Sequence, residues 1–200
     1  MLNLKTARAI GISVPPALLA RWPLGTRQRV WLDVLLYSGL RRGDAVRYGR
    51  QHVRNGVGCI KTEKSQYKVA ATVPVLPILQ ETLEAGPCGE MTFIVGEKGK
   101  PLTKESFGNL FKKACVQAGV LGSAHGVRKI AAATAANNGA TTAQLKALFG
   151  WTSDQMAEIY TKTADRDRLG REAGHMLENA ERTSIPSPTR PVRALGRKPQ

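Results

Sequence analysis

Helix-capping signals divide the second half of the chain into successive helices, and they restrict the possible fold classes more than any other feature of the sequence. Thr103 can cap a helix that ends at Gly119 and has apolar residues at helical spacing. Thr141 and Gln144 form a capping-box pattern, and Gly150 closes the apolar run after them. Further helices are predicted over residues 128–138, after Ser153 or Asp154, and over residues 165–179.

The first half of the chain mixes helix and strand patterns. Residues 26–37 have apolar side chains at helical spacing, and a second helix is expected near residues 43–50. Residues 57–60 and 69–75 are short β-type runs joined by a polar stretch, which is typical of a hairpin. Residues 91–95 are expected to add a third strand. The predicted fold is therefore mainly α with a small antiparallel β-sheet.

The charge of the chain points to a polyanionic partner. Thirty Lys and Arg against fifteen Asp and Glu give a net charge of +15, and residues 182–200 hold five of the basic residues and no acid. Nucleic acid is favoured over membrane, because no basic amphipathic helix stands out and no apolar run approaches the roughly 18 residues of a membrane span. The three cysteines are widely spaced and form no metal-binding pattern, and no cluster of Asp, Glu and His has metal-ligand spacing. The sequence also has no Gly-rich phosphate loop, so neither a metal nor a cofactor is expected.

Composition divides the chain into three parts. Residues 1–21 differ in composition from the rest of the chain, contain Pro15-Pro16, and resemble the C-terminal tail of bacterial ABC-transporter substrate-binding proteins. This resemblance implies a fusion remnant without a role in the main function. Residues 22–180 are predicted to form the main domain. Residues 181–200 are predicted to form a disordered basic tail.

Three short motifs occur along the chain in a specific order. The first is Leu40-Arg41-Arg42-Gly43-Asp44, the second is His125-Gly126-Val127-Arg128, and the third is Gly150-Trp151 with Tyr160 nine residues after Trp151. Each motif alone has little specificity, because such residues usually have a structural explanation as surface charge or core aromatics. Together, in this order on a basic chain, they resemble the catalytic domain of the tyrosine recombinases (phage integrase family) over residues 22–179.

The resemblance implies a role for each motif residue. Arg41 and Arg128 would clamp one phosphate, which suits the planar fork of a guanidinium, and Arg42 is the competitor of Arg41. His125 would manage the proton of a nucleophilic Tyr160. A lysine of the hairpin would act as general acid, with Lys64 favoured over Lys61 and Lys68. Trp151 would donate its indole N–H to a phosphate oxygen, and Asp44 would orient Arg41.

The same resemblance implies a site-specific recombinase or integrase of a mobile element, working in the bacterial cytoplasm at the nucleoid. Double-stranded DNA and further copies of the chain, as a tetramer, would be its partners. Family members usually carry an additional N-terminal helical domain, which the residues before Trp22 are too few to form. Two alternatives therefore stay open: a truncated, catalytically weak DNA-binding remnant, and a type IB topoisomerase-like activity.

Overall fold

The computed structural model describes residues 15–162, 164 and 169–174. The chain divides into two compact units, Met1–Asp165 and Arg166–Gln200. In the second unit, residues 169–174 are helical, and most of the helix predicted over residues 165–179 lies outside the described residues. The predicted tail, residues 181–200, lies outside them entirely.

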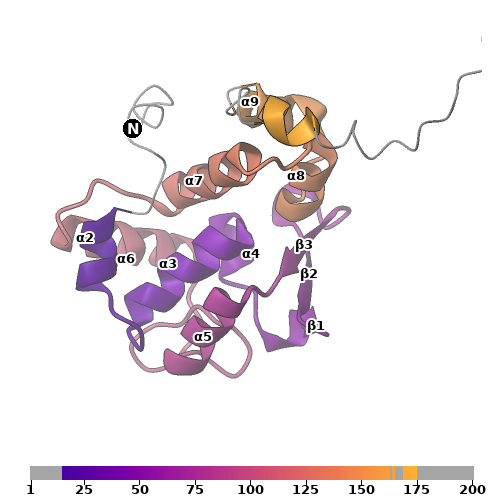
Figure 1. The fold of residues 1–200 in the computed structure, drawn as a ribbon. Coiled ribbons are helices and arrows are strands. Elements are labelled where there is room, and N and C mark those ends of the chain that lie inside the picture. The colour runs from indigo at the N-terminus through magenta and orange to yellow at the C-terminus, as the bar shows by residue number, and fades with distance from the viewer. Residues whose placement is uncertain (1–14, 163, 165–168, 175–200) are drawn as a thin grey trace, which may run out of the picture. The chain divides into compact units, whose positions relative to one another are not determined.

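The first unit has the predicted architecture, mainly helical with one small antiparallel sheet (Figure 1). Its elements in chain order are α2 (Pro16–Arg21), α3 (Arg27–Ser38), α4 (Arg42–Ala45), η1 (Arg50–His52), β1 (Val53–Arg54), β2 (Val57–Lys61), η2 (Glu63–Ser65), β3 (Ala70–Pro74), α5 (Pro77–Ala85), α6 (Lys104–Gln117), α7 (Ala124–Asn137), α8 (Thr142–Phe149) and α9 (Asp154–Thr161). Within the described part of the chain, no helix is both long and apolar enough to cross a membrane.

Helix α3 lies at the centre of the unit, in contact with α5, α6, α7 and β3 (Figure 1). It is buried on nearly all sides, and even the carboxylate of Asp33 is inside. That charge is compensated by Arg29, whose Nε donates to Asp33 Oδ2 at 2.7 Å, and by the Thr82 hydroxyl at 2.6 Å. A buried charge is tolerated when it is paired and hydrogen-bonded in this way.

Helix α2 packs into the same core. The main domain is predicted to begin at residue 22, directly after this helix. Leu18 is 4% exposed and joins the apolar cluster that contains Trp22 and Val30. Pro16 begins α2. This position suits proline, since the first residues of a helix have no intrahelical N–H partner. Residues 1–14 lie outside the described part, and their predicted origin stays a prediction.

The sheet has the strand order β1-β2-β3, and both pairings are antiparallel. Asn55 and Gly56, with φ of 50° and 74°, form the tight turn between β1 and β2. The predicted hairpin of β2 and β3 is confirmed, with Val57 opposite Pro74 and Lys61 opposite Ala70. The third strand predicted over residues 91–95 is wrong: β1 is the third strand, and Val95 makes only an isolated bridge to Pro101.

The predicted helix caps of the second half are present. The Thr103 hydroxyl accepts from Ser106 N at the start of α6, and Thr141 and Gln144 form a complete capping box on α8. Helix α7 begins four residues earlier than predicted, with Ser123 as its cap. This earlier start places His125 and Arg128 on one helix.

Candidate functional site

Arg128 is the most deeply buried of the candidate residues, at 5% exposure. Its Nη1 donates to the carbonyl oxygen of Gly39, and its Nη2 donates to that of Phe149 at 3.0 Å. Among the described residues no carboxylate forms an ion pair with it. Burial lowers the pKa of Arg128, and the nearby charge of Arg41 lowers it further. The guanidinium is thus held by backbone carbonyls and has no ion-pair partner in the described part of the chain, although the charge of Asp44 acts on it from a distance.

Arg41 directly precedes α4, and its guanidinium lines the same cavity as Arg128. Its Nη1 is buried and has no hydrogen-bond partner in the described part of the chain. A cavity of about 430 Å³ is lined by Arg41, His125 and Arg128, together with residues of α6 and of the N-terminus of α7. The two cations repel each other across the cavity, and within the described residues neither forms an ion pair, an arrangement that an anion such as a phosphate would relieve.

His125 lies one helical turn before Arg128 on α7 and is solvent-exposed. Burial of part of the ring lowers its pKa from 6.5, and the charges of Lys129, Arg128, Arg41 and Lys64 lower it further. The imidazole is therefore neutral at pH 7 and able to accept a proton.

Tyr160 on α9 is joined to this cluster by aromatic stacking. Its ring lies nearly parallel to that of Trp151, with centroids 5.5 Å apart, and Trp151 also stacks on Phe149 at 4.8 Å. The guanidinium carbon of Arg128 lies 5.1 Å from the Phe149 ring centroid and 5.5 Å from that of Trp151. Burial raises the pKa of Tyr160, and the charge of Arg128 partly offsets this rise.

Trp151 has the burial of a core residue and also an indole N–H that could serve a phosphate. The side chain is 4% exposed, as a core residue would be, and its Nε1 is buried without a hydrogen-bond partner among the described residues. An unpaired buried N–H is costly, so a phosphate oxygen within reach of it would find a ready donor.

The hairpin between β2 and β3 places Lys64 in the short helix η2, where it is exposed. Among the three lysines considered, the charge of Lys64 is the one that acts on His125. Lys61 stands at the end of β2, where its carbonyl accepts from Arg47 at 3.0 Å. The effect of its charge on His125 supports Lys64, and Lys61 and Lys68 stay open as alternatives.

Asp44, which is predicted to orient Arg41, makes its hydrogen bonds to other groups. The carboxylate is 1% exposed, and its Oδ1 accepts from Arg47 Nη2 at 2.6 Å and from the backbone N–H of Glu63 at 2.8 Å. Asp44 therefore connects the segment of Arg41 to the turn of Lys64. Only its charge acts on Arg41, where it raises the pKa against the larger lowering effect of burial.

Arg42, the competitor of Arg41, also lines this cavity, but its other contacts differ from those of Arg41. Its guanidinium lies against Gly108 of α6, where a Cβ would collide with it, and its charge acts on Glu63 and Lys104. Asn109 and Lys112 of α6 also line the cavity. The sequence could not single these two out, because a polar residue on an exposed helix face has no distinguishing pattern.

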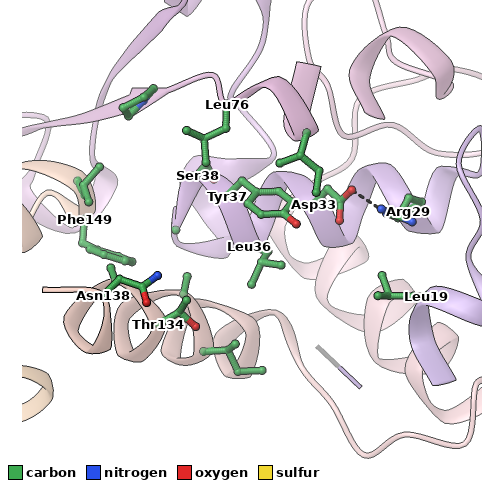
Figure 2. A pocket seen from close by; sticks show the side chains of 17 residues that line it. Leu19, Arg29, Asp33, Leu36, Tyr37, Ser38, Leu76, Thr134, Asn138 and Phe149 are labelled. Atoms are coloured by element: carbon green, nitrogen blue, oxygen red, sulfur yellow. Dashed lines mark hydrogen bonds and ion pairs between the residues drawn. The ribbon is translucent and has the colours of Figure 1, made fainter. Parts of the chain in front are cut away.

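A second cavity, of about 570 Å³, lies behind the Arg128 anchor and is mostly apolar (Figure 2). Leu36, Tyr37, Leu76 and Phe149 line it, and Gly39 contributes to its wall. Its charged lining residues, Arg29 and Asp33, are paired with each other. Its two charged side chains therefore compensate each other, and the cavity shares Gly39 and Phe149 with the support of Arg128.

Taken together, the cluster can bind an anion between two arginines, with a phenol, a neutral imidazole and a lysine at hand. Nucleophilic attack at a phosphate needs these groups: charge stabilisation, a nucleophile, a base and an acid. Within the described residues, no group of three or more His, Cys, Asp or Glu side chains could hold a metal ion.

The chain matches the model of the phage integrase family over residues 17–167. It is structurally similar to a lambda integrase dimer bound to a core site, with 20% identity, a TM-score of 0.57, and coverage of 70% of this chain and 53% of that one. For XerA recombinase these values are 16%, 0.54, 77% and 57%. For the lambda integrase catalytic core they are 18%, 0.53, 62% and 82%.

The chain spans about half the length of the first of these solved structures. No curated protein matches it.

Proposed function

Because the chain belongs to the phage integrase family, we propose that it cleaves and rejoins strands of duplex DNA through a covalent link to Tyr160. The observation that carries this proposal is the pair Arg41 and Arg128, two buried or half-buried cations that share a cavity with His125 and form no ion pair with any carboxylate of the described residues. The stacking of Tyr160 beside Arg128, through Trp151, supplies a nucleophile next to the anion site.

The chemistry assigns one task to each residue. The Tyr160 oxygen attacks the phosphorus, and its proton passes to neutral His125. The bond from phosphorus to the 5′ oxygen breaks, and Lys64 protonates that leaving oxygen. Arg41 and Arg128 stabilise the negative charge on the non-bridging oxygens. A 5′ hydroxyl then attacks the 3′-phosphotyrosine, which restores the phosphodiester and frees Tyr160 without any energy source.

The partners are inferred from the charge and from the relatives. A net charge of +15 favours a nucleic acid, and lambda integrase has been solved as a dimer on a core site and as a tetramer on a Holliday junction. We propose by analogy that copies of this chain assemble on two DNA duplexes as a tetramer. Such a substrate would place the protein at the nucleoid in the bacterial cytoplasm.

The test uses a pool of nicked DNA duplexes with randomised sequence around the nick, so that a cleaved strand loses a short fragment and the covalent intermediate accumulates. The wild-type chain should give an adduct that survives denaturant, and mass mapping should place the nucleotide on Tyr160. Tyr160→Phe should abolish the adduct, whereas Tyr37→Phe, in the apolar cavity, should retain it.

The other outcomes identify the alternatives. An adduct that persists in Tyr160→Phe would contradict the assignment of the nucleophile. DNA binding without any adduct would indicate a non-catalytic remnant. Plasmid relaxation without exchange of strands between duplexes would indicate a topoisomerase-like activity.

A further inference from the structure

Glu63, which directly precedes Lys64, is the point where three separate elements meet. Its carboxylate accepts from Lys104 Nζ of α6 at 2.6 Å, and its backbone N–H donates to Asp44 of α4 at 2.8 Å. The first contact spans 41 positions of the chain and the second spans 19. The turn of Lys64 is thus fastened on one side to α4 and on the other to α6.

The Glu63 carboxylate also packs close to Gly43. A Cβ at Gly43 would collide with Glu63 Oε2, so the side chain lies directly against the backbone of α4. Gly43 is the second residue after Arg41. The carboxylate thus lies between the turn of Lys64 and the segment that supplies the Arg41 guanidinium.

The charge around Glu63 is also specific. The hydrogen bond and charge of Lys104, together with the weaker effects of Arg47 and Arg42, lower the pKa of the Glu63 carboxyl. The Glu63 carboxylate thus lies near three cations, Lys104 of α6, Arg42 of α4 and Arg47 after α4. It forms an ion pair with Lys104, while Arg47 is paired with Asp44. Arg47 in turn lies over the Tyr67 ring at 5.1 Å, which ties the far side of the turn to the same site.

We infer that Glu63 is a positioning residue, whose carboxylate, held by Lys104 and pressed against Gly43, keeps the turn of Lys64 at the reacting cluster. This inference rests on the proposed function. The ion pair is exposed on both sides, so it contributes little to the stability of the fold. Its effect is geometric: a catalytic group displaced by about 1 Å can lose up to about 10²-fold in rate.

Loss of the Glu63 carboxylate should slow cleavage without weakening DNA binding, which a general loss of structure would not do. Glu63→Gln keeps the shape of the side chain and removes a negative charge, so DNA affinity should be unchanged or higher. The rate of strand cleavage at saturating DNA should fall by about tenfold, because Lys64 no longer reaches the leaving oxygen reliably. Lys104→Met should slow cleavage similarly, and the double variant should be no slower than Glu63→Gln, since both changes remove one interaction.

The decisive measurement compares two substrates in single-turnover cleavage. In one, the leaving atom is the natural 5′ oxygen, and in the other it is sulfur, which departs without a proton because a thiol is far more acidic than an alcohol. Lys64→Ala should be slow on the oxygen substrate and close to wild type on the sulfur substrate. Glu63→Gln should show the same rescue. Glu84→Gln, an exposed acid on α5, should match wild type on both.

The possible failures are distinguishable. If the wild-type chain forms no adduct with either substrate, the proposed function fails. If the wild type reacts and Lys64→Ala is rescued, but Glu63→Gln cleaves like wild type or stays slow on sulfur, the inference about Glu63 is wrong. Thermal unfolding of each variant identifies any loss of fold, and Glu63→Ala provides a second variant for the same comparison.

Discussion

The indole of Trp151 and the phenol ring of Tyr160 lie nearly parallel, with an angle of 11° between their planes and their centroids 5.5 Å apart. Trp151 comes directly after Gly150, which closes α8 in the left-handed conformation with φ of 59°. The stack therefore links the position of Tyr160 on α9 to the end of α8. The nine-residue spacing seen in the sequence has this contact as its physical basis.

Replacement of Trp151 separates its ring from its N–H. Trp151→Phe retains an aromatic ring for stacking and should slow cleavage by about tenfold, the value of one lost hydrogen bond to the phosphate. Trp151→Ala removes the ring as well and should lower the free energy of unfolding by about 3–5 kcal/mol. Its cleavage rate should fall by about 10²-fold, because Tyr160 loses its support. Urea unfolding and single-turnover cleavage measure both effects, and wild-type cleavage by Trp151→Ala would exclude a role for the stack.

Substitution of Arg128 by lysine tests whether the fork, and not merely the charge, is needed. A lysine ammonium cannot bond both backbone carbonyls, of Gly39 and Phe149, and also reach a phosphate. Arg128→Lys should therefore slow cleavage by about 10²-fold or more, while DNA affinity falls much less. Lys129→Arg, the reverse exchange at the adjacent exposed position, is the matched control and should behave as wild type. Equal losses in DNA affinity and cleavage rate would indicate that Arg128 only contacts the DNA backbone and does not stabilise the transition state.

The lowered pKa of His125 predicts the pH dependence of cleavage. A base is active when neutral, so the rate at subsaturating DNA should fall with decreasing pH only below the ordinary histidine pKa of 6.5. Bound phosphate favours the charged imidazole, so this acid limb should move to higher pH at saturating DNA. His125→Asn should be slow and should lack the limb. An acid limb above pH 6.5 at subsaturating DNA would contradict the neutral-base assignment.

The parts of the fold predicted correctly from the sequence are those with local causes. Thr103 and the pair Thr141 and Gln144 cap helices through their own side chains, so neighbouring residues suffice to identify them. Asn55-Gly56 carries equally local information, since this pair favours a two-residue hairpin turn, but it also fits the end of the helix predicted near residues 43–50. Strand β1 was missed for that reason.

Other features depend on contacts that no local pattern contains. Residues 91–95 have the composition of a strand, but Phe93 N bonds to the carbonyl of Tyr48, outside the sheet. Likewise, the sequence assigns Asp44 to Arg41 nearby, whereas Asp44 bonds to Glu63, 19 residues away. The motif residues could be recognised from their order, but the way the hairpin folds back onto α4 had to be seen in the structure.

Leu18 tests whether α2 is an integral part of the domain. It is 4% exposed, whereas Leu19 on the same helix is 40% exposed. Leu18→Ala should lower the free energy of unfolding by about 2–4 kcal/mol, through lost burial and a cavity beside Trp22. Leu19→Ala should change it by less than about 1 kcal/mol. Equal small effects in urea unfolding would indicate that α2 is a detachable segment, as the composition of residues 1–21 suggests.

The salt dependence of DNA binding tests how much of the affinity is electrostatic. The chain carries a net charge of +15, and each phosphate neutralised contributes about 0.9 to the slope of log affinity against log salt concentration. Deletion of residues 182–200 removes five basic residues and no acid, so it should weaken binding and flatten this slope. The cleavage rate at saturating DNA should not change, because the candidate site residues all lie before residue 161.

The measurement is a salt titration of the binding of the full chain and the truncated chain to several unrelated duplexes. Binding dominated by charge should be similar for all sequences, with dissociation constants of about 10⁻⁴–10⁻⁶ M at physiological salt. A variant with the five basic residues changed to glutamine, at unchanged length, separates the effect of charge from that of chain length. Nanomolar binding to one duplex alone by the full chain would contradict the prediction, because base contacts made by this domain would then dominate its affinity.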